Sequence, residues 1–324
     1  MTPPRYLAAR LAQVLPVVLM IVTANFFLMQ LAPGDMADVM AGEAGAATPE
    51  FLASLRAAFG ADQPLATRFL QYLGRVLTLD LGFSFRNGKP VLDLILSRAP
   101  ATALLLGSSL VVALAVGVSL GWVAARGRGG WADRAVSLVT TIGFATPLFW
   151  VGLMMIVLFA VELRWLPTGG IYDADADLTG MAFLLDVARH LVMPVMTLAI
   201  FYVAIYARLS RAAVLEVEQL DFVRTARAKG LSRRRIALAH VLRNALLPVV
   251  TMTGLQLGTL LSGALVVETV FAWPGMGRLT FDAVNQRDLN LLLGILFCTS
   301  LLVILVNLAT DLVYALLDPR IELR

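Results

Sequence analysis

The 324-residue sequence contains few of the residues on which most enzymes and metal sites depend. It has one Cys, two His and only 15% charged residues, whereas 59% of its residues are hydrophobic. The single Cys298 cannot form an intrachain disulfide, and so few His and Cys residues leave no dense metal cluster. Gly88-Lys89 is followed by Pro90, where a phosphate-binding loop needs Ser or Thr. We therefore expect no catalytic residue, metal site or bound cofactor in this chain.

Six stretches lack Asp, Glu, Lys and Arg entirely, and each is long enough to cross a bilayer as a helix. These stretches are residues 11–34, 99–125, 135–161, 190–207, 244–267 and 289–310. They exclude a soluble enzyme or a nucleic-acid-binding domain as the main body and predict an all-α integral membrane protein with six transmembrane helices. The first stretch exceeds the apolar core of a secretory signal, so we expect it to be retained as a membrane span.

The charges between these stretches are unevenly divided. Residues on one predicted side of the membrane have a net charge of +9, and those on the other side have −5. The basic side comprises residues 1–10, 126–134, 208–243 and 311–324, and the acidic side comprises residues 35–98, 162–189 and 268–288. Because Lys and Arg are enriched in cytoplasmic loops, both termini are predicted to be cytoplasmic. Topology thus accounts for the pI of about 9.6, and no nucleic-acid partner is expected.

The segment 35–98 is too long for a simple connection and contains signals for two short amphipathic helices. The first is predicted from Thr48 to Gly60, with Pro49 at its first position. The second begins at Pro64 and places apolar residues at helical spacing, namely Leu65, Phe69, Tyr72, Leu73 and Val76. These helices either cover the ends of the spans, which is the interpretation we favour, or bind an outside protein.

Small residues recur four apart within two of the spans. They include Gly117 and Gly121 in residues 99–125, and Gly254, Gly258 and Ser262 in residues 244–267. Such residues let helix backbones approach closely in a membrane. We expect packing within the chain, the alternative being that one stripe lies at a subunit interface. Bends are expected at the prolines in or beside spans, Pro147, Pro194 and Pro248.

None of the six stretches contains a carboxylate that could hold a coupling proton or sodium ion. Asn25, His190 and Asn307 are the strongest polar candidates in or near them, and a lone His at a span boundary is more often an interfacial residue with its own partner. Transport driven by an ion gradient is therefore disfavoured. If ATP drives transport, another chain must bind it.

The cytoplasmic loop 208–243 contains the most informative pattern. The sequence from Asp221 to Pro248, DFVRTARAKGLSRRRIALAHVLRNALLP, predicts a helix to Lys229 that is ended by Gly230. A second helix, capped at Ser232, is predicted to continue toward residues 244–267. Phe222, Ala226 and Gly230 are four apart and would let another surface approach closely. The alternative is an interfacial helix whose basic residues, Arg224, Arg227 and Lys229, meet anionic lipid headgroups.

This loop resembles the coupling motif of permease subunits of ATP-binding cassette (ABC) importers, in the branch for dipeptides and oligopeptides. The resemblance extends along the chain in a series of strings. They are LAPGD at 31–35, DLGFSFRNGKPV at 80–91, TPLFW at 146–150, WLPTGG at 165–170, VETVFAWPGMGRL at 267–279 and LLDPR at 316–320.

The resemblance implies a six-helix permease of the type I importer fold in the cytoplasmic (inner) membrane of a bacterium-like cell. It also implies a homologous second permease, two ATPase subunits that bind ATP, an extracytoplasmic substrate-binding protein and contact with membrane lipid. By position, the ATPase-coupling segment comprises Asp221, Phe222, Val223, Arg224, Thr225, Ala226, Arg227, Ala228, Lys229, Gly230 and Leu231. We expect the segments 35–98 and 268–288 to face the binding protein.

The chain departs from the family pattern at two places. Arg224-Thr225-Ala226 replaces the E-A-A triplet, so no salt bridge from its acidic member is expected. The sequence QRDLN at 286–290 differs from the usual Asn-Arg-Asp-Tyr-Pro, and no substrate-contacting residue is assigned. Short peptides are the expected cargo. Nickel chelates, glutathione or another small solute are the alternatives within the family, and a gradient-driven transporter or a non-transporting scaffold is the alternative outside it.

Overall fold

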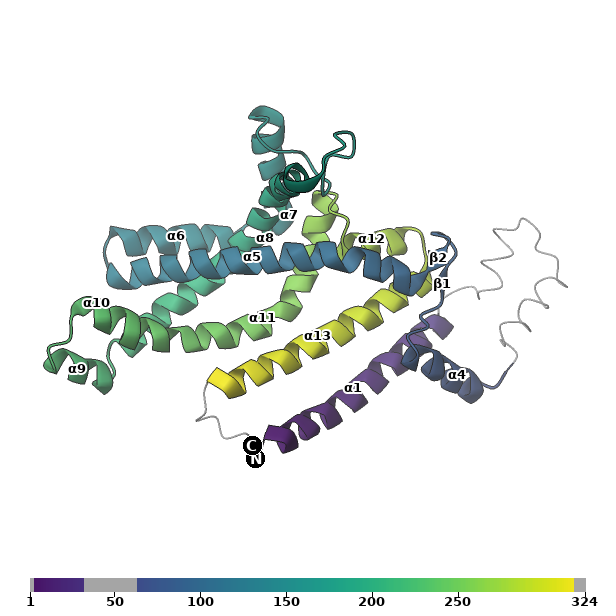
Figure 1. Cartoon of the computed structure of the whole chain (residues 1–324), viewed down its shortest axis with the longest axis horizontal. Coiled ribbons are helices and arrows are strands. Elements are labelled where there is room, and N and C mark those ends of the chain that lie inside the picture. Colours follow the sequence, from purple (N-terminus) through teal and green to yellow (C-terminus); the bar gives the residue numbers. More distant parts are fainter. Residues whose placement is uncertain (1–2, 32–62, 318–324) are drawn as a thin grey trace. The chain divides into compact units, whose positions relative to one another are not determined.

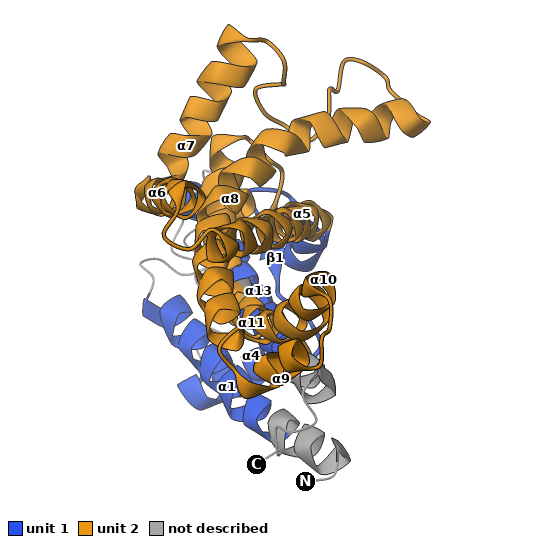
Figure 2. Ribbon diagram, turned by 90° about the vertical axis from the view of Figure 1, so that its left-hand side faces the viewer, with its two compact units in different colours: residues 1–96, 283–308, 315–324 blue, residues 97–282, 309–314 orange. Residues whose placement is uncertain are grey.

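The computed structural model describes residues 3–31 and 63–317, which are almost entirely helical (Figure 1). The chain forms two compact units (Figure 2), the first made of residues 1–96, 283–308 and 315–324 and the second of residues 97–282 and 309–314. The helices are α1 (Pro3–Leu31), α4 (Leu65–Leu77), α5 (Val91–Arg126), α6 (Trp131–Ala145), α7 (Leu148–Met155), the π-helix η1 (Ile156–Glu162), α8 (Gly180–Val217), α9 (Asp221–Ala228), α10 (Arg233–Arg235), the π-helix η2 (Ile236–Leu242), α11 (Arg243–Val270), α12 (Met276–Asn285) and α13 (Leu289–Leu317).

Five helical stretches in the described part of the chain are long and apolar enough to cross a membrane, and a bent pair of helices raises the number to six. All six charge-free stretches overlap these helices. The predicted all-α membrane fold is therefore confirmed. Its origin is physical, because only a helix satisfies every backbone N–H and C=O group within a single segment in lipid.

The third predicted span, residues 135–161, is not one continuous helix. It is divided into α6 and α7–η1, whose axes differ by 101°. The break lies at Thr146 and Pro147, which are extended with ψ angles of 131° and 133°. Proline lacks an N–H and disfavours helical geometry in the residue before it, so the helix stops there rather than bending slightly. The expected bend at Pro147 is thus a complete break.

Several helices extend beyond the charge-free stretches that predicted them. Helix α5 begins at Val91 rather than near residue 99, and α8 runs from Gly180 to Val217 around the predicted span 190–207. Charged side chains mark where a helix leaves the hydrocarbon, whereas the backbone remains helical until a breaking residue ends it. The charge-free stretches therefore mark shorter ranges than the helices themselves.

In the first unit, α4 packs on α1 through aromatic and aliphatic side chains. The ring of Phe26 lies 5.3 Å from that of Phe69 and 5.8 Å from that of Tyr72, measured between centroids. Val22 and Val76 are buried in the same cluster. Helix α4 occupies the position of the second predicted amphipathic helix and covers its own unit, as in the favoured interpretation. The first predicted helix, Thr48–Gly60, lies outside the described residues.

Part of the turn-rich sequence before α5 forms a short hairpin in the same unit. Strands β1 (Phe83–Ser84) and β2 (Lys89–Pro90) are antiparallel, with Phe83 opposite Pro90. The buried Ser84 hydroxyl donates a hydrogen bond to the carboxylate of Asp288, which lies just before α13. The amide nitrogen of Asn290 donates to the carbonyl oxygen of Phe83 at 3.2 Å. These bonds join the hairpin to the start of the last membrane helix.

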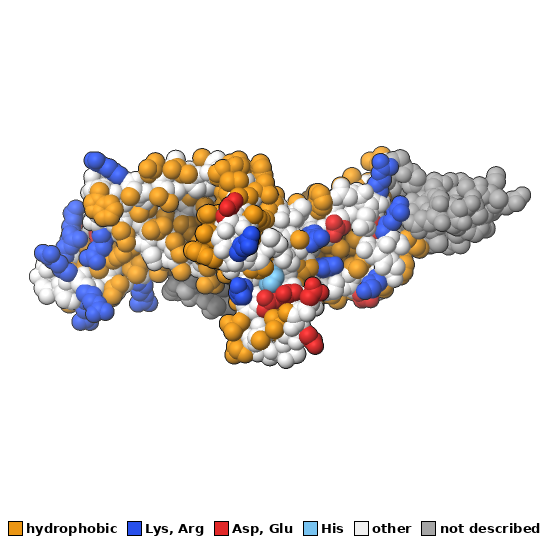
Figure 3. All heavy atoms as spheres, turned by 90° about the horizontal axis from the view of Figure 1, so that it is seen from above, with side chains coloured by type: hydrophobic (Ala, Val, Ile, Leu, Met, Phe, Trp, Pro, Cys, Tyr) orange, Lys and Arg blue, Asp and Glu red, His pale blue; other side chains and the backbone are white. Residues whose placement is uncertain are grey.

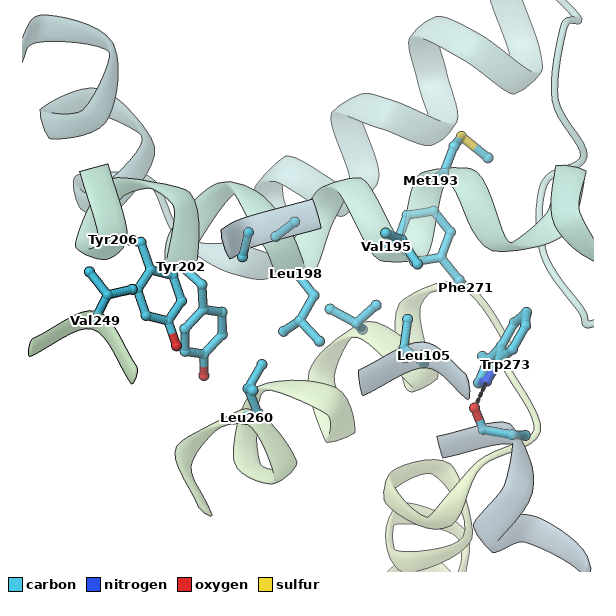
Figure 4. Close-up of a cluster of buried hydrophobic side chains, with 14 residues drawn as sticks. Leu105, Met193, Val195, Leu198, Tyr202, Tyr206, Val249, Leu260, Phe271 and Trp273 are labelled. Carbon is cyan, nitrogen blue, oxygen red and sulfur yellow. Dashed lines mark hydrogen bonds between the residues drawn. The ribbon is translucent and has the colours of Figure 1, made fainter. Parts of the chain in front are cut away.

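The second unit is built around α8, which packs against α6, α7 and α11. Its buried side chains meet residues of α5 and α11 in one apolar core (Figure 4). The core includes Leu105, Leu198, Tyr202, Leu260, Phe271 and Trp273. Helix α8 is the most enclosed of the membrane-capable helices, since 61% of its most apolar 18-residue stretch is buried. The other helices of this unit therefore depend on α8 for their position.

The close approach of α5 to α8 requires two of the predicted packing glycines. A Cβ atom at Gly117 would lie 2.7 Å from the Cβ of Tyr206, and one at Gly121 would lie 2.7 Å from the Cβ of Ser210. Neither distance is compatible with ordinary van der Waals contact. On α11, Gly254 is buried, Gly258 is half-buried and Ser262 is exposed. Only the first of these three is therefore enclosed in the single chain.

A buried carboxylate fixes the turn that follows α11. Glu268 is fully buried and accepts hydrogen bonds from the Thr102 hydroxyl at 2.6 Å and from the backbone N–H groups of Gly277 and Arg278 at 2.7 and 3.1 Å. The indole N–H of Trp273 donates to the carbonyl oxygen of Ala101 at 2.9 Å. The turn is thus joined to α5 by side chains that would be costly to bury without partners.

Two matched substitutions on α5 test the close approach to α8. Gly121→Ala is expected to destabilise the protein by about 1–3 kcal/mol because the added methyl group overlaps α8. Gly107→Ala, at a position with no atom within 4 Å of the added Cβ, is expected to stabilise the helix by about 0.5–1 kcal/mol. Thermal unfolding of the purified detergent-solubilised protein measures both effects, and an unchanged midpoint for Gly121→Ala would contradict the packing.

Candidate functional site

The loop between α8 and α11 contains the short helix α9, whose ends follow from its sequence. Leu220 is extended, and Asp221 places a carboxylate in the first turn, where the helix dipole favours it. The helix ends at Ala228, and Gly230, two residues later, has a φ of +73° that glycine readily adopts. Ser232 then accepts a hydrogen bond on its hydroxyl from the N–H of Arg235 at 3.4 Å and caps the next helix. The predicted helix, its terminating glycine and the second cap are all present.

One face of α9 is buried in its own unit. Val223 is 0% exposed and Ala226 is 5% exposed. They pack with residues from the end of α8 and from η2 and α11, namely Val214, Val217, Ile236, Val241 and Ala245. Their spacing of three residues places both on one side of the helix. This apolar contact holds α9 against the helices that lead into the membrane.

The other residues of the predicted coupling segment are accessible. Phe222 is 41% exposed, and the Arg224 side chain is 70% exposed and lies 3.5 Å from the carboxylate of Asp221. The half-buried member is Leu231, and the exposed members are Asp221, Thr225, Arg227, Ala228, Lys229 and Gly230. This surface combines one large apolar side chain with several cations.

The expected stripe of Phe222, Ala226 and Gly230 is wrong in one respect. Ala226 faces the buried cluster rather than an approaching partner. A spacing of four residues does not by itself show which face of α9 is buried. The buried face is the one that carries the apolar residues Val223 and Ala226. Phe222 and Gly230 remain available on the surface.

A continuous run of helical residues connects this segment to the membrane. Helix α10, η2 and α11 follow one another without a break from Arg233 to Val270. The side-chain amide of Asn244 at the start of α11 donates to the carbonyl oxygen of His240 in η2 at 2.6 Å. Because α9 also packs on η2, a displacement of α9 would be passed directly to α11.

Basic side chains surround the same end of the second unit. Figure 3 shows Lys and Arg gathered at the end that carries α9 and α10. A pocket of about 410 Å³ there is lined by residues of α5, α8, α9 and the loop after α5. Its charged lining residues are Arg126, Arg128, Glu218 and Arg227. The surface therefore favours an acidic partner.

An ion pair fixes α6 beside α8 in this region. Arg211 contacts Asp133 with two nitrogens, at 2.6 Å to Oδ1 and 2.8 Å to Oδ2. The N–H of Gly129 donates to the same carboxylate at 3.0 Å. Such a bidentate pair has a defined geometry, so it orients the loop before α6 as well as holding two helices together.

The three polar residues predicted as candidates in or near the spans have different surroundings. His190 is buried, with Nδ1 2.9 Å from the carbonyl oxygen of Asp186 and 3.5 Å from a carboxylate oxygen of Asp186. Asn25 is also buried and donates to the carbonyl oxygen of Leu293 at 3.3 Å. Asn307 is exposed on α13. Asn25 and His190 thus have local partners, which suits a structural role.

Residues 117–121 of α5 match G-x-S-x-G, the sequence motif of a nucleophile elbow. The structure places its Ser119 in the middle of a helix, where the hydroxyl donates to the carbonyl oxygen of Ala115 at 2.6 Å. A nucleophile elbow needs a sharp turn between a strand and a helix. The two glycines instead permit the contact with α8.

Part of the expected docking surface at residues 268–288 is buried. Glu268, Phe271 and Trp273 are at most 1% exposed because they pack against their own unit. The turn-rich sequence also contains α12, which was not predicted. Within this segment, accessible residues lie mainly in its second half, including Phe281 at 45% and Val284 at 55% exposed. Contact between this segment and a binding protein stays a prediction, and it concerns these accessible residues. Residues 35–62 lie outside the described part of the chain.

Sequence reasoning did not single out Glu268 or Gln256. Glu268 directly follows a charge-free stretch and was assigned to a loop, although α11 continues through it to Val270. Gln256 lies within residues 244–267 and is uncharged, so counting charges passed over it. The signal that would have found it is a primary amide near the centre of an otherwise apolar segment.

Comparisons with known proteins agree with this architecture. Residues 117–323 match the family described as "Binding-protein-dependent transport system inner membrane component", and residues 4–106 match its N-terminal family. The sequence is 39% identical to the "Di/tripeptide transport system permease protein DppB" of Pseudomonas aeruginosa, over 98% of both chains. It is 37% identical to the "Dipeptide transport system permease protein DppB" of Escherichia coli K12, again over 98% of both chains.

A solved structure shows the same fold. The structure titled "Inward facing conformations of the MetNI methionine ABC transporter" aligns with a TM-score of 0.57 at 18% sequence identity, covering 70% of this chain and 97% of that chain. At this identity the likeness concerns the fold alone. The family match covers more than half of the chain, and the two curated relatives align along nearly all of it. The chain therefore belongs to the family of inner membrane components of binding-protein-dependent transport systems.

Proposed function

We propose that this protein is a permease subunit of an ABC importer that moves short peptides across the cytoplasmic membrane. The observation that carries the proposal is the near full-length similarity to permeases named for dipeptides and tripeptides. The charge-free spans and the exposed helix α9 are what such a subunit needs. The chain itself does no bond chemistry in this proposal, and ATP is hydrolysed on other subunits.

Two ATPase subunits, a homologous second permease and an extracytoplasmic binding protein would complete the transporter. One ATPase would contact the exposed face of α9, with Phe222 as an apolar anchor and the surrounding Arg and Lys residues meeting acidic side chains. The buried contacts of Val223 and Ala226 would keep α9 attached to the permease during this contact. The binding protein would deliver peptide from the opposite side of the membrane.

The mechanism follows from how α9 is connected. When ATP brings the two ATPase subunits together, each docked helix is displaced with its ATPase. The apolar cluster around Val223 and the helical residues from Ser232 onward would pass this displacement to α11. Binding energy at the ATPase would thereby favour one arrangement of the membrane helices over another.

The function predicts a specific cargo. A strain that lacks this transporter should take up labelled dipeptides and tripeptides when the complete set of subunits is restored. Unlabelled short peptides are expected to compete with the labelled peptide. Glutathione, chelated nickel and free methionine serve as matched competitors. Competition by one of these compounds, with none by peptides, would contradict the proposed substrate class.

The coupling role predicts that Phe222→Ala lowers peptide uptake strongly without preventing membrane insertion. Truncating a central aromatic anchor costs about 2 kcal/mol of docking energy, which corresponds to about 30-fold in affinity. Uptake and ATP hydrolysis are measured together in proteoliposomes. Leu104→Ala on α5 is the control, because Leu104 is also 41% exposed but lies away from α9. Equal uptake by the two variants would exclude Phe222 from coupling.

The charge asymmetry predicts that α9 and both termini are cytoplasmic. In a Cys298→Ala background, which contains no other Cys, Lys89→Cys on β2 should react with an impermeant maleimide applied to intact spheroplasts. Lys229→Cys should react only after the membrane is permeabilised. Both side chains are exposed in the structure. The reverse labelling pattern would refute this orientation.

A further inference from the structure

A primary amide lies near the centre of the fifth membrane segment. Gln256 is the fourteenth residue of α11, which contains 28 residues. It is about 20 Å along the helix axis from either end, at a rise of 1.5 Å per residue. The surrounding stretch, residues 244–267, has no charged residue. Gln256 therefore lies deep within the hydrocarbon thickness of a membrane, which is about 30 Å.

The oxygen side of this amide has a partner within the second unit. Thr259 Oγ1 lies 2.6 Å from Gln256 Oε1 and 2.8 Å from the backbone oxygen of the same residue. The hydroxyl of Tyr202 on α8 donates to Thr259 Oγ1 at 3.4 Å. Figure 4 shows Tyr202 beside Leu260, so α8 supports this part of α11. The acceptor of the amide is thus engaged by a defined chain of hydroxyl groups.

The nitrogen side of the amide differs. Among the residues that the structure describes, none accepts a hydrogen bond from the two N–H groups of Gln256, which is only half-buried. Thr251, by contrast, donates to the carbonyl oxygen of Leu247 in its own helix at 3.0 Å. A hydroxyl can satisfy itself in this way, whereas two unused amide donors facing lipid would be costly.

Gln256 borders an accessible stripe that contains three hydroxyl side chains. Within residues 244–267, the exposed residues of α11 are Leu247, Pro248, Thr251, Leu255, Thr259 and Ser262. Within residues 99–125 of α5, by contrast, the exposed residues are apolar or glycine except Ser119, whose hydroxyl donates to its own helix. Polar groups within a membrane face the protein interior or a water-filled cavity. The α5 surface therefore suits lipid, and the α11 stripe suits a polar pathway.

We propose that Gln256, oriented by Thr259 and Tyr202, donates hydrogen bonds to carbonyl or carboxylate oxygens of a short peptide midway through the membrane. A peptide backbone offers these acceptors whatever its side chains are. Thr259 and Ser262 are small and exposed, and the absence of charge in the stripe imposes no preference for acidic or basic peptides. This inference rests on the proposed peptide importer function.

The first experiment compares Gln256→Leu with Gln256→Asn in the complete transporter reconstituted in proteoliposomes. Gln256→Leu should lower the maximal rate of dipeptide uptake about tenfold at saturating loaded binding protein, as expected for one lost hydrogen bond of about 1.4 kcal/mol. Gln256→Asn retains an amide and should recover part of the rate. The amount of assembled complex should not change in either variant.

A second experiment tests whether water reaches this position. In a Cys298→Ala background, Gln256→Cys should react with a charged, water-soluble thiol reagent in the assembled transporter, and excess dipeptide with binding protein and ATP should slow the reaction. Val111→Cys is the matched control, since Val111 lies near the middle of residues 99–125 and is 67% exposed on the aliphatic surface of α5. We expect no reaction at Val111→Cys.

The possible failures are distinguishable. If the unmodified transporter takes up no peptide, the proposed function itself is wrong. If it takes up peptide and Gln256→Leu does so equally well, the substrate contact is wrong. Loss of complex assembly in Gln256→Leu, together with an unreactive Gln256→Cys, would show that the amide joins two permease subunits and would also overturn the proposal.

Discussion

The contact between α5 and α8 is the constraint on which the second unit depends. Lipid provides no hydrophobic force that drives apolar helices together, so the helices must gain from close van der Waals packing. Gly117 and Gly121 allow the backbone of α5 to lie directly against the side chains and backbone of α8. With α8 enclosed in this way, α6, α7 and α11 have a fixed surface on which to pack.

Three buried ionisable groups of this fold have defined partners. Glu268 has one hydroxyl and two backbone donors, Asp133 has the Arg211 guanidinium, and His190 lies beside Asp186. Each arrangement joins or orients segments outside the central part of a span. Gln256 differs because its amide donors have no acceptor among the residues that the structure describes. The first three groups stabilise the structure, whereas Gln256 is suited to contact a passing solute.

Sequence reasoning located the features that depend on local chemistry. Charge-free length predicted the membrane helices. Gly230 and Ser232 marked the end of α9 and the start of α10, because chain conformation and capping are local properties. Features that depend on distant contacts were missed. The burial of Ala226 is determined by α8 and η2, and the burial of Glu268 is determined by Thr102, 166 residues earlier in the chain. Pro147 predicted a bend, but its 101° angle reflects how α7 packs on α8 and α11.

The charge-free spans also have an electrical consequence. A unit charge that moves across a potential of 100 mV changes in energy by about 2.3 kcal/mol. Because the stretches such as residues 99–125 and 244–267 contain no Asp, Glu, Lys or Arg, their rearrangement moves almost no fixed charge through the membrane field. The voltage therefore acts on the transported solute and not on these helices. A zwitterionic dipeptide would cross without electrical work, whereas a cationic peptide would be drawn inward by the interior-negative potential of the cell.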